Sequence, residues 1–103
     1  ELLIVEEQAR AREAVEAARE RLGIVDLAVE DARRALVAEE QRLSLGEGRS
    51  RNVLDAQKDL TTAERRANVA AYDLILAYTD LLAALGVPLI PAEVLDGLVS
   101  PTP

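Results

Sequence analysis

The sequence contains no cysteine, histidine, phenylalanine, tryptophan or methionine, and its two aromatic residues are both tyrosines. Without cysteine there can be no disulfide, thiolate metal site or cysteine nucleophile, and without histidine the usual acid–base catalyst is missing. Aromatic side chains usually supply much of a globular core, so their scarcity argues against a rounded core. No nucleophile–base pair, phosphate-binding loop or metal-ligand spacing is visible. We therefore expect neither an enzyme nor a bound cofactor.

The chain also lacks a long apolar run. Its longest uncharged stretch, Leu81 to Ala92, is interrupted by Gly86, Pro88 and Pro91, and it is well short of the ~20 residues that a membrane-spanning helix needs. We expect that this segment does not itself span a membrane. No secretory signal is visible either, and a start at Glu1 in an already helical pattern suggests a fragment or a processed product.

The charge is unbalanced, with 19 acidic residues against 12 basic ones and a formal net charge of −7. Such a surface repels phosphate backbones, so we expect no nucleic-acid partner. The clustered charges Arg33, Arg34, Glu39 and Glu40 are interpreted as solvated helix faces.

Apolar residues in the first half recur at alternating steps of four and three, which is the heptad seam of a coiled coil. The seam comprises Ala11, Val15, Ala18, Leu22, Val25, Val29, Ala32 and Leu36. A second set, called here the alanine flank, lies beside it and consists of Ala14, Ala17, Ile24, Ala28, Ala35 and Ala38. One face therefore packs tightly, while the flank is able to meet a further helix.

Two glycines in three residues, Gly46 and Gly48, end this pattern with the strongest turn signal in the chain. Asn52 is a plausible N-cap of a second helix, and Asp55 would then lie near its positive end. The second helix repeats the seam at Val53, Ala56, Leu60, Ala63, Ala67, Ala70, Leu74, Ala77, Leu81 and Ala84.

The pattern predicts an all-α fold: a long antiparallel, coiled-coil-type helical hairpin over residues 1–86. Its parts are a helix at about 2–45, a tip at 46–51 and a helix at about 52–85, which Gly86 would end as the C′ residue. Residues 87–103 are expected to form an extended tail that could hold a short helix at 91–96. About half of the seam positions are alanine, so the hairpin buries little area, and we expect it to pack against more helices.

The stretch from Gln41 to Gly86 resembles the TolC-like outer-membrane efflux proteins. The shared features, in order, are the glycine turn at Gly46, then Val53-Leu54-Asp55-Ala56-Gln57, Ala71-Tyr72-Asp73 and Ala84-Leu85-Gly86. The first helix matches only as an alanine-rich amphipathic helix. The resemblance implies a homotrimeric duct whose helical hairpins form an α-barrel in the periplasm below an outer-membrane β-barrel. This chain would then be about the last quarter of such a protein.

The same resemblance implies partners and sites. The periplasmic tip, which in the family meets an adaptor protein that bridges to an inner-membrane transporter, would be Leu45, Gly46, Glu47, Gly48, Arg49 and Ser50. Acidic residues just after the tip can ring the closed entrance of the lumen; Asp55 occupies one such position, and Asn52 replaces the other. Family members can also lock the tip with a Tyr and an Arg, where this chain has Leu43 and Gly48.

Two other functions fit the same pattern. The first is an interaction module, a self-contained or designed hairpin that dimerises into a four-helix bundle, because heptads do not specify which partner they meet. The second is the hairpin of the adaptor itself. Adaptor hairpins emerge from lipoyl-like β segments, and nothing strand-like flanks this hairpin.

Overall fold

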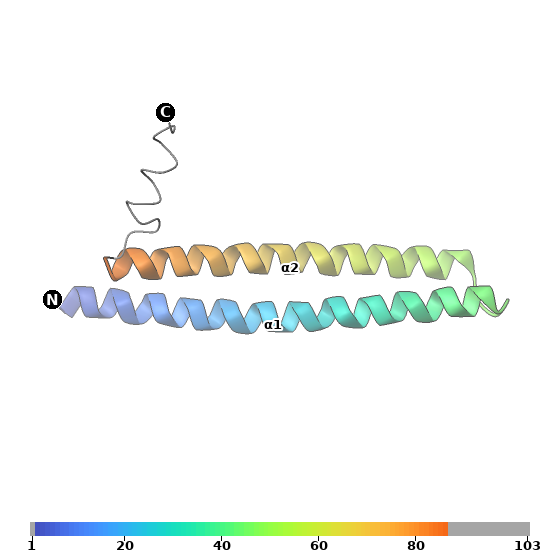
Figure 1. The fold of residues 1–103 in the computed structure, drawn as a ribbon, viewed down its shortest axis with the longest axis horizontal. Helices are drawn as coiled ribbons and strands as arrows, with labels where there is room; N and C mark the ends of the chain where they lie inside the picture. The colour runs from blue at the N-terminus through green and yellow to red at the C-terminus, as the bar shows by residue number, and fades with distance from the viewer. Residues whose placement is uncertain (1, 87–103) are drawn as a thin grey trace, which may run out of the picture.

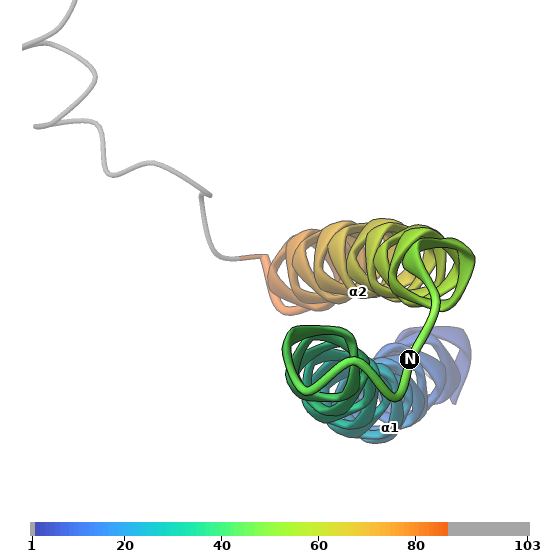
Figure 2. The ribbon, with the colours of Figure 1, turned by 90° about the vertical axis from the view of Figure 1, so that its right-hand side faces the viewer.

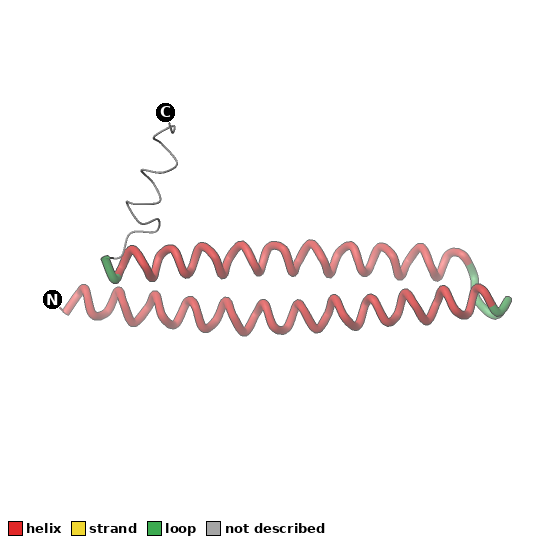
Figure 3. Tube along the Cα trace, viewed as in Figure 1, coloured by secondary structure: helices red, strands yellow, loops and turns green. Residues whose placement is uncertain are grey.

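The computed structural model describes residues 2–86; residues 1 and 87–103 lie outside the described part. Two helices make up nearly all of it, α1 at Leu2–Ser44 and α2 at Ser50–Ala84. They lie antiparallel and side by side along almost their whole length (Figure 1), and one short loop joins them (Figure 3). The predicted all-α hairpin is confirmed. The predicted tail at 87–103, with its short helix at 91–96, falls outside the described residues.

The helix ends differ from the predicted ones by one or two residues. α1 ends at Ser44, and α2 begins at Ser50 and ends at Ala84. Gly86 ends α2 as predicted: its φ is +77°, and its N–H donates to the carbonyl oxygen of Ala83 at 3.1 Å. A glycine in the left-handed region is the usual C′ residue, because a side chain there would clash with the backbone.

The seam between the helices agrees with the predicted heptads, since every predicted seam residue is buried or half-buried. The buried side chains are Val15, Ala18, Ala56, Ala63, Ala70 and Ala77. The four buried alanines of α2 recur every seventh residue, so one row of small side chains faces α1 along the whole hairpin. Viewed from its end, the hairpin shows the two helices crossing each other (Figure 2), as a repeat shorter than 3.6 residues per turn requires.

The alanine flank is uncovered. All six of its residues are exposed, and Ile24 keeps 67% of its surface. The outward side of α2 also carries exposed apolar side chains, including Val69 at 61%, Tyr72 at 61% and Ile75 at 60%. The hairpin therefore buries only its central seam and leaves apolar positions of both helices in contact with solvent.

Polar contacts border the seam on both sides. On one side Arg21 pairs with Asp73 at 4.0 Å, and on the other Arg33 pairs with Glu64 at 3.7 Å. Tyr78 packs against the core, and the Arg19 guanidinium donates to its hydroxyl and lies 5.4 Å from the centre of its ring. The side chains of the two ion pairs keep 43% or more of their surface exposed, so each ion pair contributes at most about 1 kcal/mol. The apolar seam is the main attraction between the helices.

Within residues 2–86, neither helix holds a stretch that is both long and apolar enough to cross a bilayer.

Replacing Ala70 by leucine should push the helices apart, because Ala70 is only 3% exposed and faces α1 directly. We expect Ala70→Leu to lower the free energy of unfolding by ~1–3 kcal/mol, measured by urea denaturation followed by circular dichroism. Ala9→Leu makes the same exchange at an exposed helical position and should change stability by less than ~0.5 kcal/mol. Equal effects of the two substitutions would show that the alanine row does not set the helix spacing.

Candidate docking tip

The tip begins with a regular helix end. The N–H of Gly46 donates to the carbonyl oxygen of Leu43 at 3.1 Å, and the N–H of Glu47 donates to that of Arg42 at 2.9 Å. These two bonds, with Gly46 at a φ of +79°, form a Schellman motif. Gly46 is required here because other residues resist this backbone conformation.

Gly48 is needed for a different reason. Its backbone has no positive φ, but the loop folds back on the last turn of α1. A Cβ at this position would lie 3.1 Å from the Cβ of Arg42 and 3.1 Å from the backbone nitrogen of Leu43. Leu43 and Gly48, which the resemblance places where the TolC-like proteins can carry a lock, are therefore neighbours. A larger residue at 48 would have to displace this turn.

The start of α2 corrects one prediction. Arg49, and not Asn52, is the N-cap residue, with φ −120° and ψ 146°, and its side chain makes no capping hydrogen bond. Its carbonyl oxygen accepts from the N–H of Asn52 at 3.0 Å. Because the chain becomes helical directly after the glycine loop, Asn52 is the third helical residue. Asp55 lies in the second turn, so it is not at the positive helix end where we expected it.

The structure brings the predicted tip residues together at one end of the hairpin. Leu45, Gly46, Glu47, Arg49 and Ser50 are exposed, and only Gly48 is half-buried. Leu45 keeps 72% of its surface although it is a large apolar side chain. An exposed leucine beside one acid and one base is suited to a protein contact with an apolar centre and a charged rim.

The predicted entrance residues Asn52 and Asp55 are both exposed and lie three residues apart, on one face of α2. Steps of three and four continue this face to Asp59, Asp73 and Asp80, which the sequence interpretation missed. The heptad positions of these aspartates, each one residue before a seam residue, could have revealed them. With Asp55 they place four carboxylates along one side of α2, in a row that also holds Thr62, Arg66, Val69 and Leu76.

Glu39 is a second residue that the sequence interpretation placed wrongly. It is half-buried rather than solvated, and its Oε2 atom is buried without a hydrogen-bond partner among the described residues. Its other oxygen pairs with Arg42 at 3.2 Å. Glu39 lies three residues after Leu36, so it occupies the next seam position, and the heptad count could have found it. A carboxylate interrupts the apolar seam near the tip.

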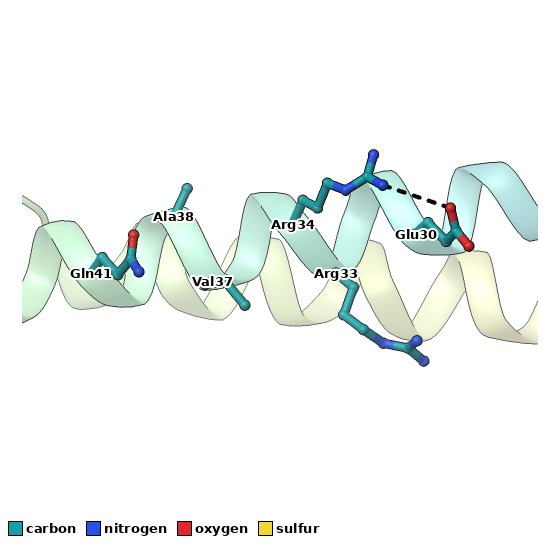
Figure 4. Close-up of a pocket in the computed structure, with 6 residues that line it drawn as sticks. All are labelled: Glu30, Arg33, Arg34, Val37, Ala38 and Gln41. Carbon is teal, nitrogen blue, oxygen red and sulfur yellow. Dashed lines mark ion pairs between the residues drawn. The ribbon is translucent and has the colours of Figure 1, made fainter.

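A hollow of about 400 Å³ lies on the outer surface of α1 (Figure 4). All the residues that line it come from α1, and Arg34 and Glu30 form an ion pair of 3.8 Å at its edge. One helix surface cannot enclose a small molecule. In the described part of the chain, no cluster of acidic side chains is arranged to hold a metal ion.

The chain matches no protein-family model, no curated protein and no solved structure. The likeness to the TolC-like proteins therefore rests on residues Gln41 to Gly86 alone.

The two tip glycines should be sensitive to substitution. We expect Gly46→Ala to lower the free energy of unfolding by ~1 kcal/mol, because alanine resists a positive φ, and Gly48→Ala to lower it through the contacts with Arg42 and Leu43. Gly23→Ala is the control: nothing lies within 4 Å of a Cβ there, so the exchange should raise helix stability by ~1 kcal/mol. Urea denaturation at one protein concentration measures all three. A stabilising Gly46→Ala would contradict the assigned turn.

Glu39→Leu should stabilise the hairpin by about 1 kcal/mol, because it replaces a half-buried carboxylate in an apolar seam and leaves Arg42 solvated. Glu40→Leu, at the adjacent exposed position, should give less than half of this gain. Thermal unfolding of the two variants measures the difference. A loss of stability in Glu39→Leu alone would mean that the Glu39–Arg42 pair outweighs the cost of burial.

Proposed function

We propose that this chain is a wall hairpin of a TolC-like outer-membrane duct and that its tip docks a periplasmic adaptor protein. The parent protein would be a homotrimer, its hairpins would form the periplasmic α-barrel, and the adaptor would link it to an inner-membrane transporter. Two lines of support come together: the similarity of residues Gln41 to Gly86 to that family, and the uncovered apolar surfaces of both helices.

The uncovered alanine flank is the observation that carries the proposal. Helix α1 has two stripes of three-and-four spacing, one in the seam and one exposed, whereas a helix of an isolated hairpin needs only one. A helix with two such rows can pack against two other helices, as each helix in the wall of a helical barrel does. The exposed Val69, Tyr72 and Ile75 on α2 likewise favour further helices beside the hairpin.

The tip supports the second part of the proposal. Its glycines fix the loop in a compact turn, and Leu45, Glu47 and Arg49 in this loop are exposed. In the duct, these side chains would meet the adaptor. Asp55 would face the entrance of the lumen, and Asp59, Asp73 and Asp80 on the same side of α2 would make that wall more attractive to cations.

A second candidate function is that of an interaction module, a hairpin that pairs with a copy of itself into a four-helix bundle. The exposed alanine flank favours it as well, because small side chains permit the close approach of any helix. The two functions differ at the tip, which has a role only in the duct.

Substitutions at the tip test the duct function in cells whose efflux depends on the duct that carries this hairpin. We expect Leu45→Asp and Arg49→Glu to reduce efflux, and with it drug resistance, by about tenfold, the change that a loss of ~1.4 kcal/mol in docking produces. Both side chains are exposed, so helicity and the amount of trimeric duct should stay normal.

Arg12→Glu is the matched control, since it reverses an exposed charge at the far end of the hairpin and should leave efflux unchanged. Full efflux in the tip variants, with the duct at its normal level, would exclude docking through the tip. A hairpin that yields no trimeric duct at all would favour the interaction module.

A further inference from the structure

On one exposed side of α1, the spacing of the positions is the same when it is counted from either end. The positions at steps of three and four on this side are called here the flank row. They comprise the six residues of the alanine flank and two charged residues that lie between them in the same spacing. In order, they are Ala14, Ala17, Arg21, Ile24, Ala28, Asp31, Ala35 and Ala38. The steps 3-4-3-4-3-4-3 are a palindrome, with two alanines at each end. Ile24 and Ala28 hold the two central positions, so a large side chain has a small one as its mirror position. The two charges stand symmetrically and have opposite signs.

We propose that the flank row binds the flank row of a second copy of this chain in the antiparallel direction. In that register Ala14 lies opposite Ala38 of the second copy, Ala17 opposite Ala35 and Ile24 opposite Ala28. Arg21 lies opposite Asp31 of the second copy, and two-fold symmetry repeats each contact. The product is a four-helix dimer whose hairpin tips point in opposite directions. The inference gives the second candidate function a direction and a register. It does not rest on the proposed duct, which would use the same flank for hairpins that point the same way.

The charges choose this direction over the parallel one. If two α1 helices met in parallel register, Arg21 would face Arg21 and Asp31 would face Asp31, which repel each other. In the antiparallel register both charged pairs attract. Within the hairpin Arg21 pairs with Asp73 at 4.0 Å and Asp31 pairs with Arg34 at 3.4 Å. All four side chains of the new pairs are exposed in the single hairpin, so these weak surface pairs can be shared or exchanged and little desolvation opposes the new contacts.

The shape of the surface also suits a helix. Beside the flank row, a groove of about 500 Å³ runs between α1 and α2, with Ile24 and Ala28 on one wall and Asp59, Thr62 and Arg66 on the other. Ile24 of the second copy would lie against this groove at Ala28. The flank row is ~36 Å long and the hairpin face two helices wide, so each copy would bury roughly 700 Å², close to the ~800 Å² typical of stable interfaces.

Helix α2 takes part at the edge of the same face. In the proposed register the two α2 helices also face each other, and the two-fold axis lies near Val69. Arg66 of one copy would then lie near Asp73 of the other, and these two residues have opposite charges. Asp59 and Asp80 of the second copy form the like-charged pair that opposes the contact. Both are exposed, so their carboxylates can turn toward water.

Charge reversal in the 103-residue chain tests the pairing. Sedimentation equilibrium should show a dimer, and Arg21→Asp and Asp31→Arg should each weaken it by ~tenfold or more, since each variant creates two repulsive contacts. An equimolar mixture of the two variants should recover the affinity as a heterodimer, because aspartates at 21 and 31 then face arginines. Arg33→Asp is the control: it also breaks one ion pair between the helices, but on the opposite side, and it should dimerise normally.

Cysteine cross-linking tests the direction, since the chain has no cysteine of its own. A mixture of Ala14→Cys and Ala38→Cys should form the mixed disulfide dimer in preference to either homodimer. These exposed positions leave folding intact. A monomeric wild-type chain, a failure of the variant mixture to associate, or a dominant Ala38→Cys homodimer would each overturn the proposal.

Discussion

The spacing of the two helices is set by alanine, and the other features of the hairpin depend on that contact. The row Ala56, Ala63, Ala70 and Ala77 lets α1 approach α2 closely, and in the described part of α1 only Val15 and Ala18 are buried to the same degree. Close approach gives good packing between backbones, but each alanine removes little apolar surface from water. The hairpin is therefore narrow and long, and its own seam supplies a modest share of the stability that a helical domain requires.

A hairpin that stabilises itself this weakly gains most from what lies beside it. Apolar residues that remain exposed, such as Ile24 on α1 and Tyr72 on α2, offer further apolar surface for such a contact. Both the duct and the self-paired dimer would use this surface, but neighbouring hairpins would point in different relative directions in the two assemblies. All the hairpins of a duct point their tips the same way, whereas the charges of Arg21 and Asp31 favour opposite tips. One chain cannot hold both arrangements at once.

The sequence predicted the fold well because heptads report burial directly. Every seam residue proposed from the spacing lies between the helices, and Gly86 ends α2 as expected. The errors came where a local preference competed with the loop. Asparagine is a common N-cap residue, but the turn formed by Gly46 and Gly48 is so short that the helix already begins after Arg49, which is the N-cap. Glu39 was assigned to the surface because of its charge, without regard to its heptad position. When a whole cluster of charged residues is assigned to the surface, a residue of that cluster that lies in the seam is overlooked.

The placement of Glu39 connects the seam to the tip. An apolar seam that continued to the turn would hold the last turns of α1 and α2 together as firmly as the middle. Instead the seam meets a carboxylate with one buried, unpartnered oxygen, and the next attachment is the turn itself, held by backbone bonds to Arg42 and Leu43. The hairpin thus has a carboxylate in its seam just behind its exposed tip. Since local opening begins where buried apolar contacts are fewest, Glu39 weakens the contact between the two helices close to the end that would meet a partner.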